Sequence, residues 1–335
     1  MTVRVGIIGT GVMGTDHARL LSGVISGAAL CAVYDVDRAR ALAVADAHPT
    51  ARVLADPIEL IHDDGIDAVL IASSDATHEA FVLACLAAGK PVLCEKPLAP
   101  TVAACRRILD AEAALGGRLV NVGFMRRYDQ GYAELRSTLH GGHVGTPLLL
   151  HCVHRNPSAP AGLPSATVIT NSAIHEIDIS RWLLGEELVA ATVHTPRPSA
   201  AAGSTQDPQL LVLESQTGVL IDIEIFVNAR YGYEVRCELV GENGTVSLDG
   251  GPDTVLRRGG MIGRSLPGDW RPRFAEAYRR ELQDWVDGLS GGSAPRGATA
   301  WDGHAATAVA EACVSALETG VRQSVELRSR PKLYD

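Results

Sequence analysis

A glycine-rich turn near the start of the chain has the spacing G-x-G-x-x-G, follows the apolar run Val3–Ile8 and precedes a helical stretch. In that setting the first glycine permits a tight turn, the second lets the backbone approach a pyrophosphate, and the third lets helix and strand pack closely. Amides at the N-terminus of the following helix would then face the phosphates. The turn predicts a dinucleotide site that includes Gly9, Gly11, Val12, Met13 and Gly14.

Asp35 ends the next apolar run, about 20 residues after the last glycine of the turn. A carboxylate at this position accepts hydrogen bonds from the adenosine ribose hydroxyls and repels a 2′-phosphate, which favours NAD over NADP. Arg38 and Arg40 lie nearby and could bind that phosphate, so the predicted preference is not strict. The alternative is a tight turn in an α/β protein that binds no cofactor.

The sequence Cys94-Glu95-Lys96-Pro97 follows the apolar run Pro91–Leu93. We expect it at the carboxyl end of a parallel strand, where ligands of open α/β sheets bind. A lysine there can stabilise a developing alkoxide and help to bind a cofactor. The alternative is a solvated lysine at a strand end.

A histidine in the second half of the chain could accept a proton. Asn171 and His175 have the spacing i,i+4, and His175 and Asp178 the spacing i,i+3, so each pair shares a face of a helix. An imidazole is suited to take a proton from a hydroxyl near neutral pH. From spacing alone, the other reading is that Asn171 or Ser172 caps the helix and that His175 is packed between domains.

These residues require elements to hold them. The first 120 residues alternate short apolar runs with helical stretches, a pattern typical of a parallel sheet covered on both faces. The expected strands are Val3–Ile8, Leu30–Tyr34, Ala68–Ala72, Pro91–Cys94 and Arg118–Val122, and the expected helices are 12–25, 37–47, 76–88 and 101–115. We predict a doubly wound Rossmann domain over residues 1–123.

The remaining residues, 124–335, predict a second, α+β domain, whose last helices could pack back on the Rossmann domain. Residues 189–248 are strand-like, and the alternation in Leu220–Ile225 suggests a sheet with one solvent-facing side. Helices are expected at 130–139, 172–184, 273–289 and 301–319, and a surface loop at Pro196–Pro208.

Composition excludes several classes of protein. A length of 335 residues favours two domains, and no apolar run approaches the ~20 residues of a membrane-spanning helix. A net charge of −9 argues against a nucleic-acid partner. Seven cysteines without a Cys-x-x-Cys pair suggest neither a disulfide framework nor a zinc site. A strand that starts almost at Met1 leaves no room for a leader, so we expect a cytoplasmic protein.

Taken together, the motifs resemble the glucose–fructose oxidoreductase/inositol dehydrogenase family (Gfo/Idh/MocA) over nearly the whole chain. The residues that carry this resemblance are Gly9-Thr10-Gly11-x-x-Gly14, Asp35, Thr77-His78, Glu95-Lys96-Pro97, Asn121–Asp129 and His175-Glu176-Ile177-Asp178. The segments Met125–Asp129 and His154–Pro157 look most like the inositol 2-dehydrogenase branch.

The resemblance implies a Rossmann domain followed by a mostly antiparallel sheet whose open face forms contacts between subunits, commonly in a homotetramer, or else in a homodimer. It also implies hydride transfer between an alcohol carbon and NAD, with Lys96 as catalytic lysine and His175 as proton acceptor. The positions that would contact the cofactor are Ser73, Ser74, Thr77, His78, Glu95 and Lys96. Those expected in the substrate pocket are Arg127, His154, Asn156 and Tyr233.

One position departs from the resemblance. The inositol branch usually has an aspartate four residues before the histidine, where this chain has Asn171. An amide cannot stabilise an imidazolium electrostatically and can only orient it. We therefore expect oxidation of a cyclitol, myo-inositol or an isomer, with Asn171 orienting the catalytic pair. A dehydrogenase for a pyranose or an aminocyclitol precursor, or a non-catalytic dinucleotide sensor, are the alternatives.

Overall fold

The computed structural model describes residues 2–248, 255–292 and 296–335, and they divide into two compact units. The first unit comprises Met1–Met125, Ala277–Thr307 and Arg328–Asp335, and the second comprises Arg126–Glu276 and Ala308–Leu327. The expected boundary after Gly123 thus lies beside the first division between units. The C-terminal part of the chain contributes to both units, so no single cut separates them.

The sheet of the first unit has the order β15-β6-β5-β4-β1-β2-β3. All its pairings are parallel except that of β15 with β6. Every residue of β4, β5 and β6 is buried, as expected for strands covered on both faces. The strands are β1 (Val3–Ile8), β2 (Ala28–Tyr34), β3 (Arg52–Val53), β4 (Ala68–Ile71), β5 (Val92–Glu95), β6 (Val120–Gly123) and β15 (Ala298–Thr299).

Side-chain caps fix where several helices of this unit begin. Asp37, Asp56 and Thr101 each accept a hydrogen bond from a backbone amide in the first turn of the helix that follows. The helices are α1 (Val12–Gly23), α2 (Arg38–Ala47), α3 (Pro57–His62), α4 (Asp75–Ala87), α5 (Val102–Leu115), the 3-10 turn η3 (Lys332–Tyr334), and the two long helices α9 (Trp270–Gly291) and α10 (Ala300–Thr319), which extend into the second unit. The predicted Rossmann arrangement is confirmed, whereas α3, β3 and β15 were not expected.

The second unit contains a sheet of order β12-β11-β7-β10-β9-β8-β16. Only β7 and β10 pair in parallel, so the predicted, mostly antiparallel sheet is confirmed. Alternate residues of β10 (Ile221, Ile223 and Ile225) are buried, while those between them are partly exposed. The strands are β7 (Pro147–Arg155), β8 (Leu188–His194), β9 (Gln209–Ser215), β10 (Leu220–Phe226), β11 (Glu234–Gly241), β12 (Gly244–Leu248) and β16 (Gln323–Ser324).

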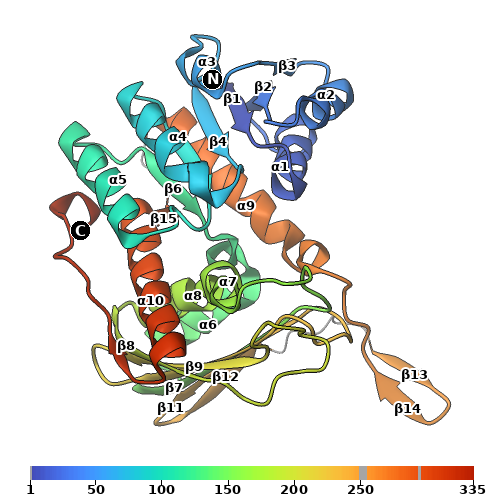
Figure 1. The fold of residues 1–335 in the computed structure, drawn as a ribbon, viewed down its shortest axis with the longest axis vertical. Helices are drawn as coiled ribbons and strands as arrows, with labels where there is room; N and C mark the ends of the chain where they lie inside the picture. Colours follow the sequence, from blue (N-terminus) through green and yellow to red (C-terminus); the bar gives the residue numbers. More distant parts are fainter. Residues whose placement is uncertain (1, 249–254, 293–295) are drawn as a thin grey trace. The chain divides into compact units, whose positions relative to one another are not determined.

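Helices pack on one face of this sheet, where α8 contacts β7 and α6 contacts β12 (Figure 1). A separate hairpin projects away from the sheet in the same view. The remaining elements of the unit are the 3-10 turn η1 (Met125–Tyr128), α6 (Gln130–His140), α7 (Ser165–Thr167), the π-helical segment η2 (Val168–Ala173), α8 (Ile174–Leu184), and the hairpin strands β13 (Leu256–Arg258) and β14 (Met261–Gly263).

The segment Pro196–Pro208 is a loop, as its composition predicts, and much of it is exposed, but the side chains of Thr205 and Asp207 are buried. The carboxylate of Asp207 is fully buried and accepts hydrogen bonds from the amide of Val227 and the side chain of Asn228, both at 2.9 Å. The hydroxyl of Thr205 donates to the carbonyl of Leu163 at 2.6 Å. These polar contacts anchor the loop, because a buried carboxylate requires hydrogen-bond donors.

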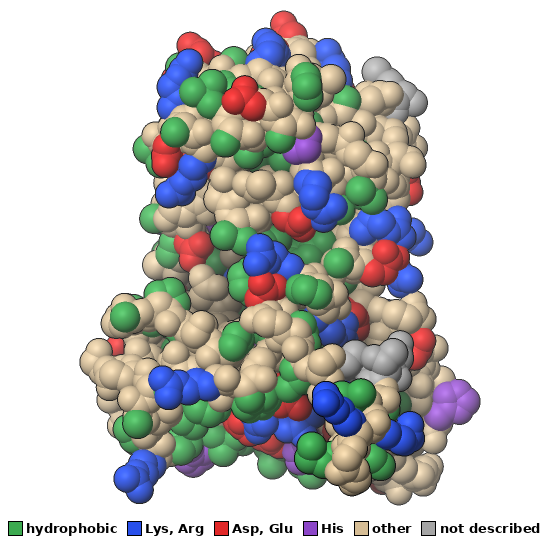
Figure 2. Space-filling model, turned by 90° about the vertical axis from the view of Figure 1, so that its right-hand side faces the viewer, with side chains coloured by type: hydrophobic (Ala, Val, Ile, Leu, Met, Phe, Trp, Pro, Cys, Tyr) green, Lys and Arg blue, Asp and Glu red, His purple; other side chains and the backbone are tan. Residues whose placement is uncertain are grey.

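Charged side chains are mixed in sign on the surface. On the face drawn in Figure 2, Lys and Arg side chains are interspersed with Asp and Glu and form no continuous basic stripe. Among the helices of the described ranges, none is both long and apolar enough to cross a membrane.

Candidate functional site

The glycine turn after β1 is shaped by close approaches that leave no room for side chains. Gly9 has φ +95°, and a Cβ there would lie 2.5 Å from backbone atoms of Ala72 and Ser73. A Cβ at Gly14 would lie 1.9 Å from the carbonyl oxygen of Gly9. Both glycines are therefore required by the packing of the turn against β4 and of α1 against the turn.

Gly11 differs from these two glycines, because a Cβ there would meet no protein atom within 4 Å. Gly11 is also the N-cap of α1 and has no side chain to satisfy the first amides of that helix. The open space beside a helix N-terminus fits a pyrophosphate that approaches the backbone closely. The residues present thus fit the dinucleotide that the sequence predicts.

Asp35 follows β2 and is held against the glycine turn. One carboxylate oxygen accepts hydrogen bonds from the amide and the hydroxyl of Thr10, and the other accepts one from the amide of Asp37 at 2.8 Å. Burial works against the charged form, but these donors outweigh it and lower the pKa of Asp35 below its usual value. The turn therefore carries a fixed negative charge where a ribose hydroxyl is expected.

The loop after β4 and the first turn of α4 contain the predicted cofactor contacts Ser73, Ser74, Thr77 and His78. Ser73 Oγ and Thr77 Oγ1 lie 2.7 Å apart, and Thr77 Oγ1 donates to the carbonyl of Ser74 at 2.7 Å. The buried ring of His78 lies 2.7 Å from the carbonyl oxygen of Pro97 and 3.2 Å from that of Ser73. These contacts join the loop to the turn that carries Lys96.

Lys96 follows the last residue of β5 and is partly exposed, while the Glu95 side chain before it is buried. The Glu95 carboxylate lies 2.8 Å from Nε2 of His17 and 3.3 Å from the amide nitrogen of Lys96. Burial favours the neutral acid, but the contacts with His17 and Lys96 outweigh it and lower the pKa of Glu95. His17 is a functional candidate that the sequence reasoning missed.

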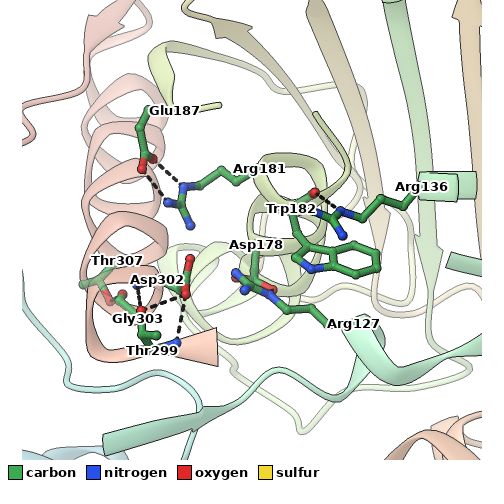
Figure 3. Close-up of polar contacts among 10 residues, drawn as sticks. All are labelled: Arg127, Arg136, Asp178, Arg181, Trp182, Glu187, Thr299, Asp302, Gly303 and Thr307. Carbon is green, nitrogen blue, oxygen red and sulfur yellow. Dashed lines mark hydrogen bonds and ion pairs between the residues drawn. The ribbon is translucent and has the colours of Figure 1, made fainter. Parts of the chain in front are cut away.

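In the second unit, two consecutive arginines of η1 bind two carboxylates of α8. Arg126 pairs with Glu176, and the side chains of both are only 1 % exposed. Arg127 binds Asp178 through two hydrogen bonds of 2.6 and 2.9 Å, and the two side chains lie alongside each other in Figure 3. Because Glu176 and Asp178 alternate with His175 and Ile177 in the sequence, these ion pairs fix the segment of α8 that carries the predicted base.

Aromatic and imidazole groups complete the cluster around Arg126. Nδ1 of His154 lies 3.1 Å from Oε2 of Glu176, and the rings of His154 and Tyr233 meet edge to face at 5.6 Å. Burial opposes the charge of Arg126, but Glu176 outweighs it and raises the arginine pKa, whereas burial raises the pKa of Tyr233 to about 12. Arg126 and Glu176 thus form a permanent ion pair, and Tyr233 stays a neutral phenol.

The helix of His175 begins earlier than its sequence predicts. It starts at Ser165, continues through the π-helical segment η2 and becomes α-helical at Ile174. Asn171 and Ser172 lie inside η2, so the reading that either residue caps this helix is wrong. Asn171 is exposed and His175 is buried, and π-helical segments often occur at functional sites.

The predicted substrate residues take different positions in the second unit. His154 and Tyr233 lie together, but the arginine beside them is Arg126, while the predicted Arg127 is directed to Asp178. Asn156 follows β7, where its backbone N–H donates to the backbone carbonyl of Phe226 and its backbone carbonyl accepts from the N–H of Ala229. The only sequence signal for the role of Arg126 was its place in an arginine doublet, which does not show which guanidinium is buried.

Both units match models of a known protein family. Residues 3–124 match the model described as oxidoreductase family, NAD-binding Rossmann fold. Residues 136–327 match the model described as oxidoreductase family, C-terminal alpha/beta domain. Both models belong to Gfo/Idh/MocA, and together they cover most of the chain.

Curated relatives and solved structures match over the full length. The chain is 54% identical to inositol 2-dehydrogenase 1 of Saccharopolyspora erythraea (100% of this chain, 99% of that protein) and 46% identical to inositol 2-dehydrogenase of Paracoccus denitrificans (100% of both). It resembles the crystal structure of myo-inositol dehydrogenase from Lactobacillus casei in complex with NAD(H) and myo-inositol, with a TM-score of 0.97, 36% identity and complete coverage of both chains.

Proposed function

The chain belongs to the Gfo/Idh/MocA oxidoreductase family, and on that premise we propose that it oxidises one secondary hydroxyl of a cyclitol, myo-inositol or an isomer, to the corresponding keto-inositol with NAD. The observation that carries this proposal is the 54% identity, over the whole chain, to an inositol 2-dehydrogenase. The similarity to a structure that holds both NAD(H) and myo-inositol supports the same substrate class.

The first unit would bind NAD. Gly9, Gly11 and Gly14 shape the turn for the pyrophosphate, and Asp35 would accept hydrogen bonds from the adenosine ribose. Bound NAD supplies the electrophilic carbon that accepts the hydride. On the strength of the family resemblance, the proposed cofactor contacts also include Val12, Met13, Arg38, Ser73, Ser74, Thr77 and His78.

Lys96 and His175 would have separate roles at the hydroxyl of the substrate that is oxidised. Lys96 would stabilise the negative charge that develops on oxygen, and His175, as a neutral imidazole, would accept the proton. The helix of His175 is held by the pairs Arg126–Glu176 and Arg127–Asp178, which gives the base a fixed direction. Asn171 would orient the imidazole or the substrate through its amide.

The second unit would supply the substrate contacts. His154, Asn156 and Tyr233 remain the proposed pocket residues. We assign Arg126 the task of fixing His154 and Tyr233, since it is buried with them and paired with Glu176. Arg127 also remains proposed, but its bidentate bond to Asp178 supports a role in holding α8 rather than direct contact with substrate.

The presence of Asn171 supports a second candidate class of substrate. Where the inositol branch usually has an aspartate, the amide changes the charge beside the base, which is consistent with another cyclitol isomer, a pyranose or an aminocyclitol precursor. A non-catalytic sensor is disfavoured because both Lys96 and His175 are present.

We further propose a cytoplasmic homotetramer, or a homodimer, formed through the outer face of the second sheet. That face carries partly exposed apolar side chains on neighbouring strands, including Leu149, Val153 and Leu220. All seven cysteines are free thiols, which fits a reducing compartment. Light scattering coupled to size exclusion would give the mass of the assembly, and a monomer would contradict the proposal.

The enzymatic proposal is tested with a panel of polyols and sugars. Reduction of NAD is followed by the near-ultraviolet absorbance of the reduced cofactor, with myo-inositol, scyllo-inositol, chiro-inositol and glucose at equal concentrations. We expect kcat/KM to be highest for one of the cyclitols. A higher kcat/KM for glucose would replace the proposed substrate class, and an absence of NAD reduction with every polyol would contradict the proposed reaction.

A further inference from the structure

We propose that His17, a residue of α1, is a positioning residue for Lys96 and acts through the carboxylate of Glu95. This inference rests on the proposed function, in which Lys96 stabilises the developing alkoxide. All the residues concerned lie in the first unit. His17 is one helical turn beyond Gly14, so the same helix would serve both the cofactor turn and the catalytic lysine.

A short chain of contacts leads from α1 to Lys96. The side chain of His17 is fully buried, and its Nε2 lies 2.8 Å from Oε1 of Glu95. The second oxygen of Glu95 lies 3.3 Å from the backbone nitrogen of Lys96, which donates to it. Glu95 is 6 % exposed, so this carboxylate cannot be satisfied mainly by water. His17 is its principal side-chain donor among the described contacts.

The neighbouring strand β6 restricts where the carboxylate of Glu95 can lie. A Cβ at Gly123, on β6, would lie 3.2 Å from both Cδ and Oε2 of Glu95. The glycine thus gives the carboxylate its space, while His17 fixes its direction from the side of α1. With both constraints present, the backbone of Lys96 is tied to a group that α1, β5 and β6 hold together.

The His17 ring has a single polar partner among the contacts of the described residues. Nδ1 is buried and has no hydrogen-bond partner there, while the ring meets Tyr278 edge to face at 5.9 Å. The contact of Nε2 with Glu95 is therefore the one through which this side chain can act, and with a hydrogen on Nε2 the ring donates to the carboxylate.

The result is a negative charge fixed beside Lys96. The titratable groups that interact electrostatically with Glu95 include the imidazole of His17 from α1, the ammonium of Lys96 and the buried thiol of Cys94, the preceding residue of β5. Gly123 brings no charge from β6. Without the His17 donor, burial would favour the neutral acid, and both the direction and the charge of Glu95 would change.

Packing around α1 does not by itself call for a polar pair at positions 17 and 95. Replacing a buried polar pair by apolar groups is often neutral or even stabilising. Structure alone therefore does not require this pair at the start of the lysine turn. The contact between the Glu95 carboxylate and the backbone nitrogen of Lys96 gives the pair a role in positioning Lys96.

Four variants separate positioning from packing. His17→Leu removes the donor and keeps an apolar volume, His17→Gln can place an amide N–H near the position of Nε2, and His17→Asn carries the same amide on a chain too short to reach. Leu21→Ala, one turn further along α1 and also buried, is the matched control for lost packing. Each protein is assayed as the full chain with NAD and the best polyol, and its Tm is measured.

We expect His17→Leu and His17→Asn to lower kcat by about 10- to 100-fold, because displacement of a catalytic group has effects of this size. The acidic limb of kcat should move to higher pH, since a carboxyl that has lost its donor is protonated more easily. In His17→Gln, both kcat and the position of the acidic limb should stay close to those of the wild-type protein. Leu21→Ala should lower Tm and leave the acidic limb in place.

A second readout needs neither substrate nor activity. The chain has only three lysines, Lys90, Lys96 and Lys332, so competitive acetylation followed by peptide mass spectrometry gives the reactivity of Lys96 relative to two internal references. Because a fixed negative charge favours the unreactive ammonium, the Lys96 to Lys332 labelling ratio should rise several-fold in His17→Leu and His17→Asn. It should be unchanged in His17→Gln and Leu21→Ala.

The two readouts keep this inference distinct from the proposed function. If the wild-type protein reduces no NAD with any polyol, the proposed function fails, and the labelling ratio still decides whether His17 positions Lys96. Should His17→Leu fail to fold, His17→Asn and His17→Gln make the same comparison. An unchanged labelling ratio and an unmoved acidic limb in His17→Asn, with a loss of Tm alone, would overturn the proposal.

Discussion

One carboxylate oxygen of Asp35 accepts two hydrogen bonds from Thr10, from its amide at 2.6 Å and from its hydroxyl at 3.0 Å. The strand β2 thereby places a negative charge directly on the glycine turn. Since these donors lower the pKa of Asp35, the charge is present throughout the physiological range. The choice of cofactor follows from this geometry, because the same charge that receives ribose hydroxyls repels a 2′-phosphate.

Replacing Asp35 by Ser should narrow the preference for NAD over NADP. Hydrogen bonds to charged groups contribute about 1.5–3 kcal/mol, so the ratio of kcat/KM for the two cofactors should fall by roughly tenfold or more. Asp37→Ser is the matched control, because Ser retains the cap of α2 and leaves the ribose carboxylate intact. Equal use of both cofactors by the wild-type protein would contradict the assignment of Asp35.

Replacing Lys96 by Ala should lower kcat by about 10²- to 10³-fold, because the lost interaction is with charge that develops in the transition state. KM for NAD should change much less. Lys90→Ala serves as the control, since the ammonium of Lys90 donates to the carbonyl of Asp63 away from the turn. If kcat of Lys96→Ala stays within a few-fold of wild type, the lysine is not the alkoxide-stabilising group.

Asn171→Asp tests whether residue 171 is coupled to the base. A carboxylate near His175 favours the imidazolium and raises the histidine pKa. Because His175 must be neutral to accept a proton, the rise of kcat/KM with pH should begin at a correspondingly higher pH. Asn171→Ala, which removes the amide without adding charge, should leave that rise in place. The same pH profile for Asn171→Asp and wild type would show that the two side chains are not coupled.

Glu176→Gln tests the ion pair that holds α8. Leaving the buried guanidinium of Arg126 without its anion should lower the free energy of unfolding by about 3–5 kcal/mol. Glu214→Gln, in the exposed pair with Arg322, should cost about 1 kcal/mol or less. Urea denaturation of both variants gives the comparison, and similar losses in the two would contradict the structural role of the buried pair.

The pH dependence of the same variant has a definite sign. Burial opposes the charge of Glu176, but Arg126 and His154 outweigh it and hold the glutamate pKa below its ordinary value. A lowered pKa stabilises the fold above the unfolded-state pKa, and this contribution is lost as pH falls through the folded-state pKa. The difference in unfolding free energy between wild type and Glu176→Gln should therefore shrink in acid. A difference that does not depend on pH would contradict the charge pairing.

Local patterns were sufficient to predict most of the first unit, apart from the short elements α3, β3 and β15. The glycine turn, the strand before it and Asp35 lie within about forty residues, and apolar runs of four to seven residues identify buried parallel strands. The exposed face of β10 was predicted for a related reason, because the alternation in Leu220–Ile225 identifies a strand with one solvent-facing side. These features depend on neighbours in the sequence.

The contacts that organise the second unit depend instead on residues far apart. Arg126 and Glu176 are fifty positions apart, and nothing in the doublet Arg126-Arg127 distinguishes the buried guanidinium from the one bound to Asp178. The π-helical turns before His175 also follow no residue pattern that periodicity detects. His17 was missed because a single histidine inside a helix gives no sign of a carboxylate on a strand almost eighty residues away.

The central claim, direct transfer of a hydride from a cyclitol carbon to NAD, is tested most directly with myo-inositol that carries deuterium on every ring carbon. The reduced cofactor is isolated after incomplete turnover and analysed by mass spectrometry. We predict that each reduced NAD contains a single deuterium and that the initial rate is lower than with unlabelled myo-inositol when hydride transfer limits it. Reduced NAD without deuterium, or a failure to reduce NAD with this and the other cyclitols, would contradict the account.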